Sequence, residues 1–186
     1  MGMPFRDARG PQRRGERRLI RAAQNGSSDA IEELFRRHWP GAYRAAYMVI
    51  RDRAAAEDVT QEAFIAAIRS LGRFDRSRPF TPWLQRIAIN KAIDHARTRS
   101  SRREVGATTE PESPSAPEGE SDPREAELQR ALGTLSPEQR AIVAMRFLLD
   151  LTPGEIARRL ELPRGTVNSR LRRALDRLAG EIGGES

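Results

Sequence analysis

The sequence predicts an all-α protein made of two small helical domains joined by a disordered acidic linker. Apolar residues recur at helical spacing in two well-separated stretches, and the stretch between them is rich in Pro, Ser, Gly and Glu. We predict the domains at residues 27–103 and 128–182, the linker at 104–127 and a basic flexible tail at 1–26.

Charge and composition restrict the function. The chain has 186 residues and a formal net charge of +7, which favours a polyanionic partner, with nucleic acid as the first candidate. Cysteine is absent and only two histidines occur, so disulfides, thiol catalysis and a histidine-based metal cluster are excluded. No apolar run approaches the length of a membrane span, and no signal-peptide core follows the basic N-terminus. We therefore expect a soluble cytoplasmic protein that is not an enzyme and needs no cofactor or metal.

The N-terminal domain is expected to open with a helix capped by Ser28 or Asp29. Pro40 and Gly41 interrupt this helix, and a kink is expected there. Its core-facing positions are Ile31, Leu34, Phe35, Ala42, Ala45, Ala46 and Val49. The preceding residues 1–18 contain six arginines, which is typical of a flexible basic tail.

A second helix is predicted from about Ala54 to Leu71. Its apolar positions are Val59, Ala63, Phe64, Ala66 and Ile68, and its polar side carries Glu57, Asp58, Gln61 and Glu62. These acids interact favourably with the positive end of their own helix. They also offer a docking face to a partner that presents Arg or Lys.

The loop Gly72 to Pro82 and the helix that follows combine basic and aromatic residues. Thr81 is expected to cap this third helix, with Pro82 at its first position. Arg86, Asn90, Asp94 and Arg97 share one face of it, with Lys91 beside them. Basic residues interleaved with aromatic residues are typical of surfaces that hold unstacked bases. The alternative is an ordinary loop that tucks Phe74 or Phe80 into the core.

The predicted linker holds eight acidic residues against Arg124, a net charge of −7. It has too few apolar residues to fold, and mutual repulsion of its acids favours extension. By contrast, residues 1–103 carry 22 basic and 11 acidic residues, and residues 128–186 carry 10 basic and seven acidic residues.

A helix–turn–helix is predicted over Thr152 to Leu178. Thr152 and Glu155 form a capping box with Pro153 at the first helical position, and Leu162–Pro163 separates this helix from a second one that begins near Arg164. On the second helix, the apolar arc of Val167, Leu171, Ala174, Leu175 and Leu178 lies roughly 150° from the polar arc of Gly165, Asn168, Ser169, Arg172, Arg173 and Asp176. Such a helix suits the DNA major groove.

Three motifs in order resemble the extracytoplasmic-function sigma factors of the bacterial sigma-70 family. They are AAAEDVTQEAFIAA at 54–67, PFTPWLQRIAINKAIDHARTRSSRR at 79–103 and LSPEQRAIVAMRFLLDLTPGEIARRLELPRGTVNSRLRRALDRL at 135–178. Members of this family keep two domains of the sigma-70 architecture, regions two and four. The resemblance implies that residues 27–103 are region two and residues 128–182 are region four.

The resemblance also implies roles for individual positions. Asp58, Gln61, Glu62 and Phe64 would contact the RNA polymerase core at its largest-subunit clamp helices, and region four would meet the flap. Recognition and melting of the −10 promoter element would involve Arg73, Phe80, Trp83, Arg86, Asn90, Lys91 and Arg97. The −35 duplex would be read by Arg164, Thr166, Asn168, Ser169, Arg170, Arg172 and Arg173. An anti-sigma protein would be a further partner.

Two departures from the family pattern and two rival interpretations remain. Thr60 stands where Val is frequent, and Asn168 stands where Lys or Arg is frequent, which leaves the promoter sequence open. One rival is a helix–turn–helix regulator that acts without polymerase, which would leave the acidic face Glu57–Phe64 and the helix Trp83–Arg103 unassigned. The other is a metal-dependent enzyme, but Asp58 and Glu62 have no evident partner acids.

Overall fold

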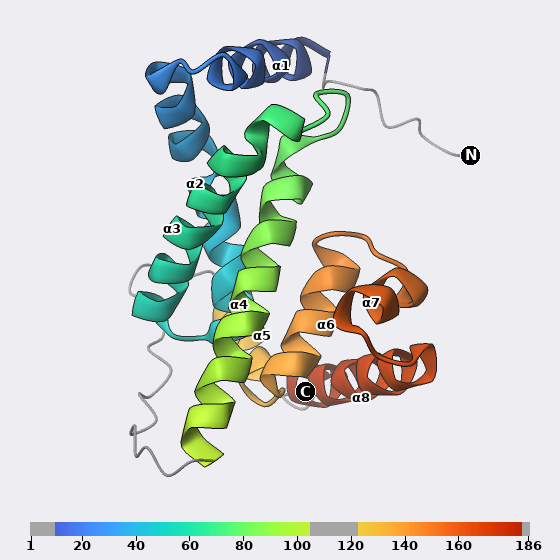
Figure 1. Cartoon of the computed structure of the whole chain (residues 1–186). Coiled ribbons are helices and arrows are strands. Elements are labelled where there is room, and N and C mark those ends of the chain that lie inside the picture. Colours follow the sequence, from blue (N-terminus) through green and yellow to red (C-terminus); the bar gives the residue numbers. More distant parts are fainter. Residues whose placement is uncertain (1–9, 105–122, 184–186) are drawn as a thin grey trace, which may run out of the picture.

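The computed structural model describes residues 10–104 and 123–183, and every regular element in these ranges is a helix (Figure 1). The predicted all-α fold is therefore confirmed. In chain order the elements are α1 (Gly10–Gln24), α2 (Ser28–Ile50), α3 (Arg53–Ser70), the 3₁₀ turn η1 (Leu71–Arg73), α4 (Phe80–Glu104), α5 (Pro123–Gly133), α6 (Pro137–Phe147), α7 (Pro153–Leu160) and α8 (Arg164–Gly183).

Helices α2, α3 and α4 pack on one another and form the N-terminal module. Ser27, rather than Ser28 or Asp29, caps α2 by accepting a hydrogen bond from the Ala30 N–H, because the helix already includes Ser28. The helix runs through Pro40 to Ile50 without the expected interruption. Asp52 caps α3 in the same way through the Ala55 N–H.

The start of α4 corrects another expectation. The helix begins at Phe80, one residue before the predicted cap Thr81. The Thr81 hydroxyl lies 3.2 Å from Nδ1 of His38 on α2, so it connects the two helices of the core.

The N-terminal segment also differs from the prediction of a flexible tail at 1–26. Residues 10–24 form α1, which lies across the end of the module (Figure 1). Ile20 and Ala23 are buried, so the helix has an apolar side that packs on α2. The many arginines of this segment, which lie on the opposite face of the helix, favoured the prediction of a flexible tail over that of a helix with an apolar side. Residues 1–9 lie outside the described part.

The C-terminal module consists of α5 to α8. Capping boxes start α6 at Ser136 and α7 at Thr152, and the second of these was predicted. Helix α5 begins at Pro123, inside the predicted linker, and its residues Ala131 and Leu132 are buried against α6 and α8 together with Leu135, which follows the helix. The rest of the predicted linker, 105–122, lies outside the described residues.

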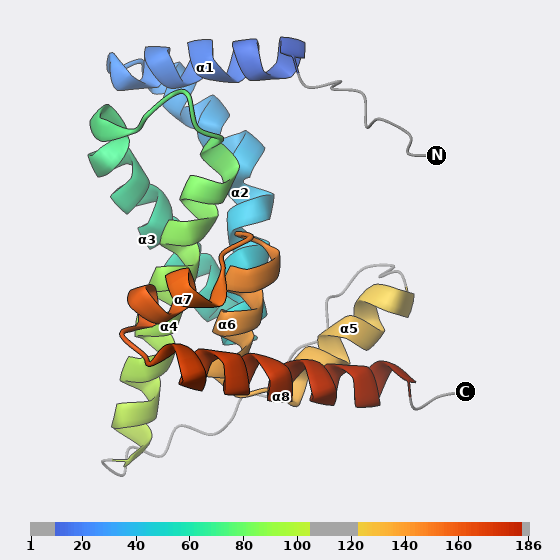
Figure 2. The ribbon, with the colours of Figure 1, turned by 90° about the vertical axis from the view of Figure 1, so that its right-hand side faces the viewer.

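The two modules pack against each other (Figure 2). One apolar cluster contains Val49 of α2, Ile89 of α4, Met145 of α6 and Ile156 of α7. Arg140 of α6 is 7% exposed at this junction. Its Nε donates to the Val49 carbonyl at 2.8 Å and its Nη1 donates to the Leu135 carbonyl at 2.6 Å. The guanidinium thus caps the carboxyl end of α2, where a cation is favourable.

Candidate nucleic-acid interface

Helix α8 presents its polar arc to solvent as the sequence predicts. Val167, Ala174 and Leu178 are buried and hold the helix on its module, whereas Leu175 is largely outside the core. The predicted reading residues Arg164, Asn168, Ser169, Arg172 and Arg173 are exposed, and Thr166 and Arg170 are partly exposed.

The contacts of these residues are local and weak. Nε of Arg172 lies 3.8 Å from Oδ2 of Asp176, and Nε of Arg173 donates to the Ser169 carbonyl at 3.2 Å. Both contacts are on the surface, where ion pairs contribute little. The two guanidinium groups can therefore leave these contacts and bind base edges at a small cost in free energy.

Helix α4 and the loop before it carry the residues predicted for the −10 element. Arg73 and Arg97 are exposed, and Trp83, Arg86, Asn90 and Lys91 are partly exposed. Lys91 forms an ion pair, because its Nζ lies 3.1 Å from Oε2 of Glu62 on α3.

Phe80 requires a correction. It is 3% exposed, and its ring lies 4.8 Å from the His38 ring and 5.5 Å from the Phe74 ring, between centroids. The ring therefore belongs to the core beneath the loop and is not available to a base in this structure. Phe74 is also buried, which agrees with the alternative interpretation of this loop.

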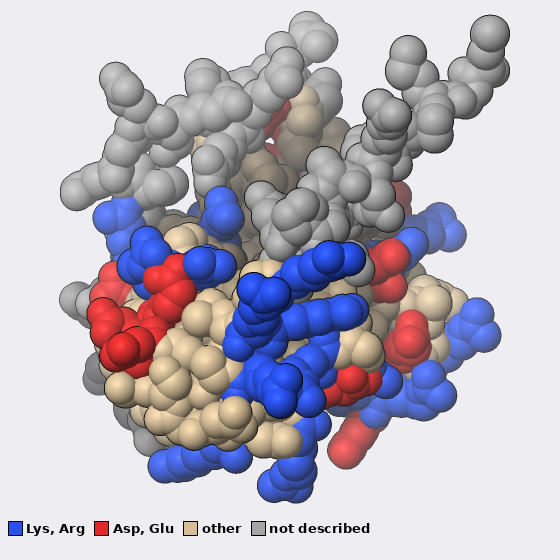
Figure 3. Space-filling view, turned by 90° about the horizontal axis from the view of Figure 1, so that it is seen from above, with Lys and Arg blue, Asp and Glu red and all other residues tan. Residues whose placement is uncertain are grey.

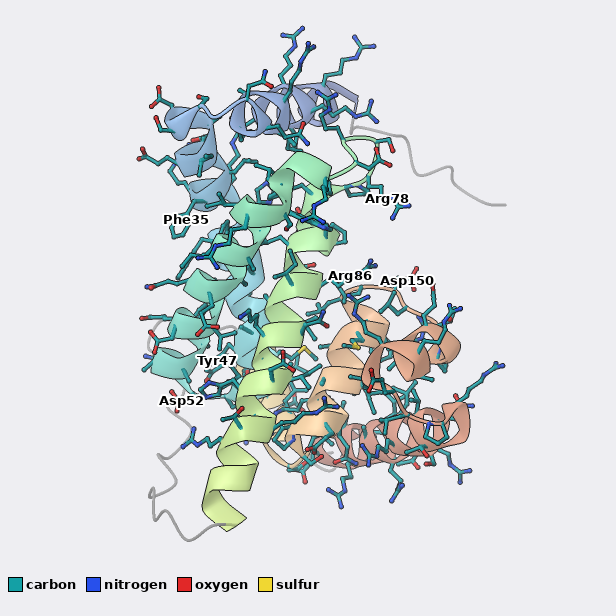
Figure 4. All side chains as sticks on the ribbon, in the orientation of Figure 1. Phe35, Tyr47, Asp52, Arg78, Arg86 and Asp150 are labelled. Carbon is teal, nitrogen blue, oxygen red and sulfur yellow. The ribbon has the colours of Figure 1, made fainter. Side chains whose placement is uncertain are left out.

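The α4 face meets the helix–turn–helix module. Nε of Arg159 on α7 donates to Oδ1 of Asn90 at 3.2 Å. Arg86, labelled in Figure 4, lies on the side of α4 that faces α6 and α7. Its Nε is buried and has no hydrogen-bond partner within the described ranges. Burial lowers the pKa of Arg159, and the nearby positive charge of Arg86 lowers it further.

Helix α3 presents a mixed acidic and apolar face. Asp58, Gln61 and Glu62 are exposed as expected. Phe64 is 4% exposed and packs against Phe35 at 4.7 Å between ring centroids, so its predicted direct contact with polymerase is not compatible with this packing. Ile65 and Ile68, at 49% and 42% exposure, lie on the outer side instead. Ile65 follows Asp58 by seven residues and Ile68 follows Gln61 by seven, so both lie on the face of these polar residues. The apolar spacing predicts Ile68 on the buried arc of this helix, whereas the structure exposes it.

Other classes of site find no support in the described residues. No group of three His, Cys, Asp or Glu side chains is arranged to hold a metal ion among residues 10–104 and 123–183. Within the same ranges, no helix combines the length and apolar character needed to cross a bilayer.

A helix–turn–helix module that lies beside a helical module with a basic face is the architecture of a two-domain DNA-binding protein. The family model for sigma-70 region 2 matches residues 34–102, and that for sigma-70 region 4 matches residues 125–178. The sigma factor SigM of Mycobacterium tuberculosis is 33% identical over 94% of this chain and 88% of its own length. The chain belongs to the extracytoplasmic-function sigma factors of the sigma-70 family.

Further similarities agree with this assignment. BldN of Streptomyces coelicolor, another such sigma factor, is 34% identical over 87% of this chain, and the match spans 63% of BldN. Among solved structures, CnrH in complex with the cytosolic domain of CnrY is 27% identical, with a TM-score of 0.56 and coverage of 92% of this chain and 99% of CnrH. The sigma factor RpoE of Bartonella quintana, solved with the anti-sigma factor NepR, is 22% identical with a TM-score of 0.64 and supports the fold.

Proposed function

We propose that this protein binds the RNA polymerase core in the bacterial cytoplasm and directs initiation at promoters whose −35 element α8 reads and whose −10 element α4 and its loop hold open. The observation that carries the proposal is the presence of three separate polar surfaces on one chain: the exposed α8 polar arc, the exposed α3 face and the partly exposed α4 face. A simple operator-binding protein needs only the first.

Helix α3 supplies the docking surface in this proposal. Asp58, Gln61 and Glu62 offer acceptors to basic side chains, and Ile65 offers exposed apolar area beside them. Interfaces of this kind depend on a small apolar centre with a polar rim. The polymerase provides the bond-forming chemistry, and this chain supplies the choice of start site.

Promoter reading divides between the modules. Arg172 and Arg173, with Asn168 and Ser169, face the −35 duplex, where each good bidentate contact discriminates by about 1–3 kcal/mol. Asn90, Trp83 and Arg86 line the path of the melted −10 strand, and Lys91 and Arg97 hold its phosphates. Opening costs a few kcal/mol per unstacked base, so the polymerase must supply additional scaffold.

The packed arrangement of the modules must change on promoter DNA. Elements about two DNA turns apart are separated by roughly 70 Å, whereas here Asn90 and Arg159 are in contact. The junction also brings like charges together, because Arg86 lies near Arg159 and Arg51 lies near Arg140. A polyanion at this face relieves that repulsion, which favours separation of the modules on DNA.

An anti-sigma protein is part of the proposal. Its support is the similar structure of CnrH bound to the cytosolic domain of CnrY, together with an apolar groove of 780 Å³ between the modules. The groove is lined by Tyr43, Met48, Leu132, Phe147 and Leu148, and Phe147 is 60% exposed. Isolation of the protein from its host in a constitutively active state, free of any inhibitor, would contradict this part.

The proposal is tested by comparing two variants in reconstituted transcription. Arg172→Ala with Arg173→Ala should reduce initiation at promoters that depend on −35 and leave core association intact. Asp58→Arg should weaken core association and leave −35 duplex binding by the free chain unchanged. Specific operator binding by the free chain, with no effect of core polymerase, would instead favour the regulator interpretation.

A further inference from the structure

Helix α1 carries an arginine stripe, defined here as Arg14, Arg17, Arg18 and Arg21. At about 100° per residue, the four side chains fall within a single arc of roughly 100°. All four are exposed, whereas Ile20 and Ala23 on the opposite side of the helix are buried. The match to the sigma-70 region 2 model begins at residue 34, so α1 lies outside it.

The stripe adjoins the loop that precedes α4. Nε2 of Gln24, in the last turn of α1, donates to the carbonyls of Leu71 and Phe74 at 2.9 and 3.0 Å and so fixes the loop beside the helix. Figure 4 shows Arg78 in this loop near one end of α1, and nitrogen-tipped side chains extend from the outer side of the helix. Seen from above in Figure 3, Lys and Arg side chains gather on this face.

Few acids offset the charge of this surface. Among the described residues, none of the four stripe arginines has an acidic side chain within ion-pair distance. Asp75 is the acid in the loop, and its pKa is lowered first by hydrogen bonds from Ser77 and then by the charges of Arg78 and Arg17. Glu16 of α1 faces His38 instead, at 3.4 Å. Arg73, Arg76 and Arg78 add to the positive side of the loop, and all three are exposed.

We propose that the arginine stripe binds the sugar–phosphate backbone of promoter DNA next to the −10 element, as a continuation of the loop surface. This proposal rests on the proposed function. Exposed guanidinium groups in a row can pair with phosphates of a polyanion and position it without reading sequence. A membrane surface is the weaker fit, because the apolar side of α1 is already buried on α2 and no apolar face remains to insert.

The test compares two matched double variants as holoenzymes with core polymerase. Arg18→Gln with Arg21→Gln removes two stripe charges, and Arg36→Gln with Arg37→Gln removes two exposed charges from α2, both of which pair with Glu33. The probe is a fork-junction DNA with a duplex −35 element and a single-stranded −10 strand, and its affinity is measured over a series of KCl concentrations. Circular dichroism and core association are measured for each variant.

The stripe variant should bind the fork more weakly, and the slope of log affinity against log salt should fall by about 0.7–0.9 for each lost phosphate contact. The α2 variant should match wild type. Wild-type holoenzyme that binds no fork DNA would sink the proposed function itself. If wild-type holoenzyme binds the fork DNA and both variants show the same salt slope, only the proposed role of the arginine stripe is overturned. A second outcome would also overturn the role of the stripe. In it, the free chain binds phosphatidylserine vesicles, the stripe variant loses this binding, and fork binding is unchanged.

Discussion

Arg159 of the helix–turn–helix module donates a hydrogen bond from its Nε to Oδ1 of Asn90 at 3.2 Å, on the face proposed to hold the melted −10 strand. The side-chain oxygen of Asn90 is therefore occupied by the protein itself while the two modules are packed together. DNA that contacts this side chain competes with Arg159.

We therefore expect Arg159→Ala to raise the affinity of the free chain for a single-stranded −10 oligonucleotide. A surface hydrogen bond contributes about 0.5–1.5 kcal/mol, so the gain should be about two- to tenfold. Fluorescence anisotropy with labelled oligonucleotide measures it. Arg158→Ala is the control, since Arg158 is an exposed neighbour on the same helix. Equal effects of the two substitutions would show that charge alone is responsible.

Arg140 is expected to hold the modules together. Burial lowers its pKa to about 10, and the nearby Arg51 charge contributes, yet the group remains charged at neutral pH. Arg140→Ala leaves the Val49 and Leu135 carbonyls without this donor, and we expect a loss of about 2–4 kcal/mol of unfolding free energy.

Urea unfolding measures that loss, and small-angle scattering should show a larger radius of gyration. Arg146→Ala removes an exposed pair with Asp150 and should change neither quantity. An unchanged radius for Arg140→Ala, in a sample that remains folded, would contradict the role assigned to Arg140 at the junction.

Ile65 is expected to be central to polymerase docking. Ile65→Arg places a charge in the apolar part of the α3 face and should weaken core association about tenfold or more, as for a residue at the centre of an interface. Folding should be unaffected, because the side chain is 49% exposed. Ile182→Arg is the matched control, at 46% exposure on α8. Core affinity is measured by competition with a labelled wild-type chain, and equal affinities for the two variants would remove Ile65 from the docking surface.

Asp52 should make the N-terminal module sensitive to acid. Burial on its own raises the pKa of this carboxyl, but hydrogen bonds from the Ala55 N–H and the Arg99 guanidinium lower it overall. A carboxyl with a lowered folded pKa stabilises the fold fully above its unfolded pKa of about 4, and this contribution is lost as pH falls through the folded pKa.

Asp52→Asn keeps an acceptor at the N-cap but loses the charged pair with Arg99. It should therefore cost about 1 kcal/mol at pH 7, and its difference from wild type should shrink below about pH 4. Urea unfolding at a series of pH values measures this. Asp94→Asn, at an exposed position on α4, should show no such pH-dependent difference. If Asp52→Asn lowers the unfolding free energy by the same amount in acid as at pH 7, the charge of the Asp52 carboxylate does not contribute to stability.

Local patterns in the sequence predicted most of the helices, because capping and periodicity act within a few residues. Thr152 and Glu155 predicted the start of α7, and the α8 arcs were predicted from spacing alone. Helix α1 was missed because arginines outnumber the few apolar residues, Ile20 and Ala23, that hold it against α2. The amino-acid composition of a helix does not show how its residues divide between the faces, whereas packing depends on the apolar face alone.

The site residues were harder to predict where contacts between distant parts of the chain decide whether a side chain is exposed. The family resemblance predicts that Phe64 and Phe80 contact partners, but their rings complete aromatic clusters within the module. The junction of Arg159 with Asn90 joins residues 69 positions apart, and no local pattern indicates it. The same limit applies to Arg140, whose partner Val49 lies 91 positions away.

The central claim is that this chain lends a bacterial polymerase core its choice of start site. The most direct measurement mixes the purified chain with core enzyme on a library of promoter-sized DNA templates and maps the 5′ ends of the transcripts. The account predicts a stable complex and transcripts that start downstream of a shared pair of −35 and −10 sequences. Core enzyme that gains neither a bound subunit nor any defined start site from this chain would contradict it.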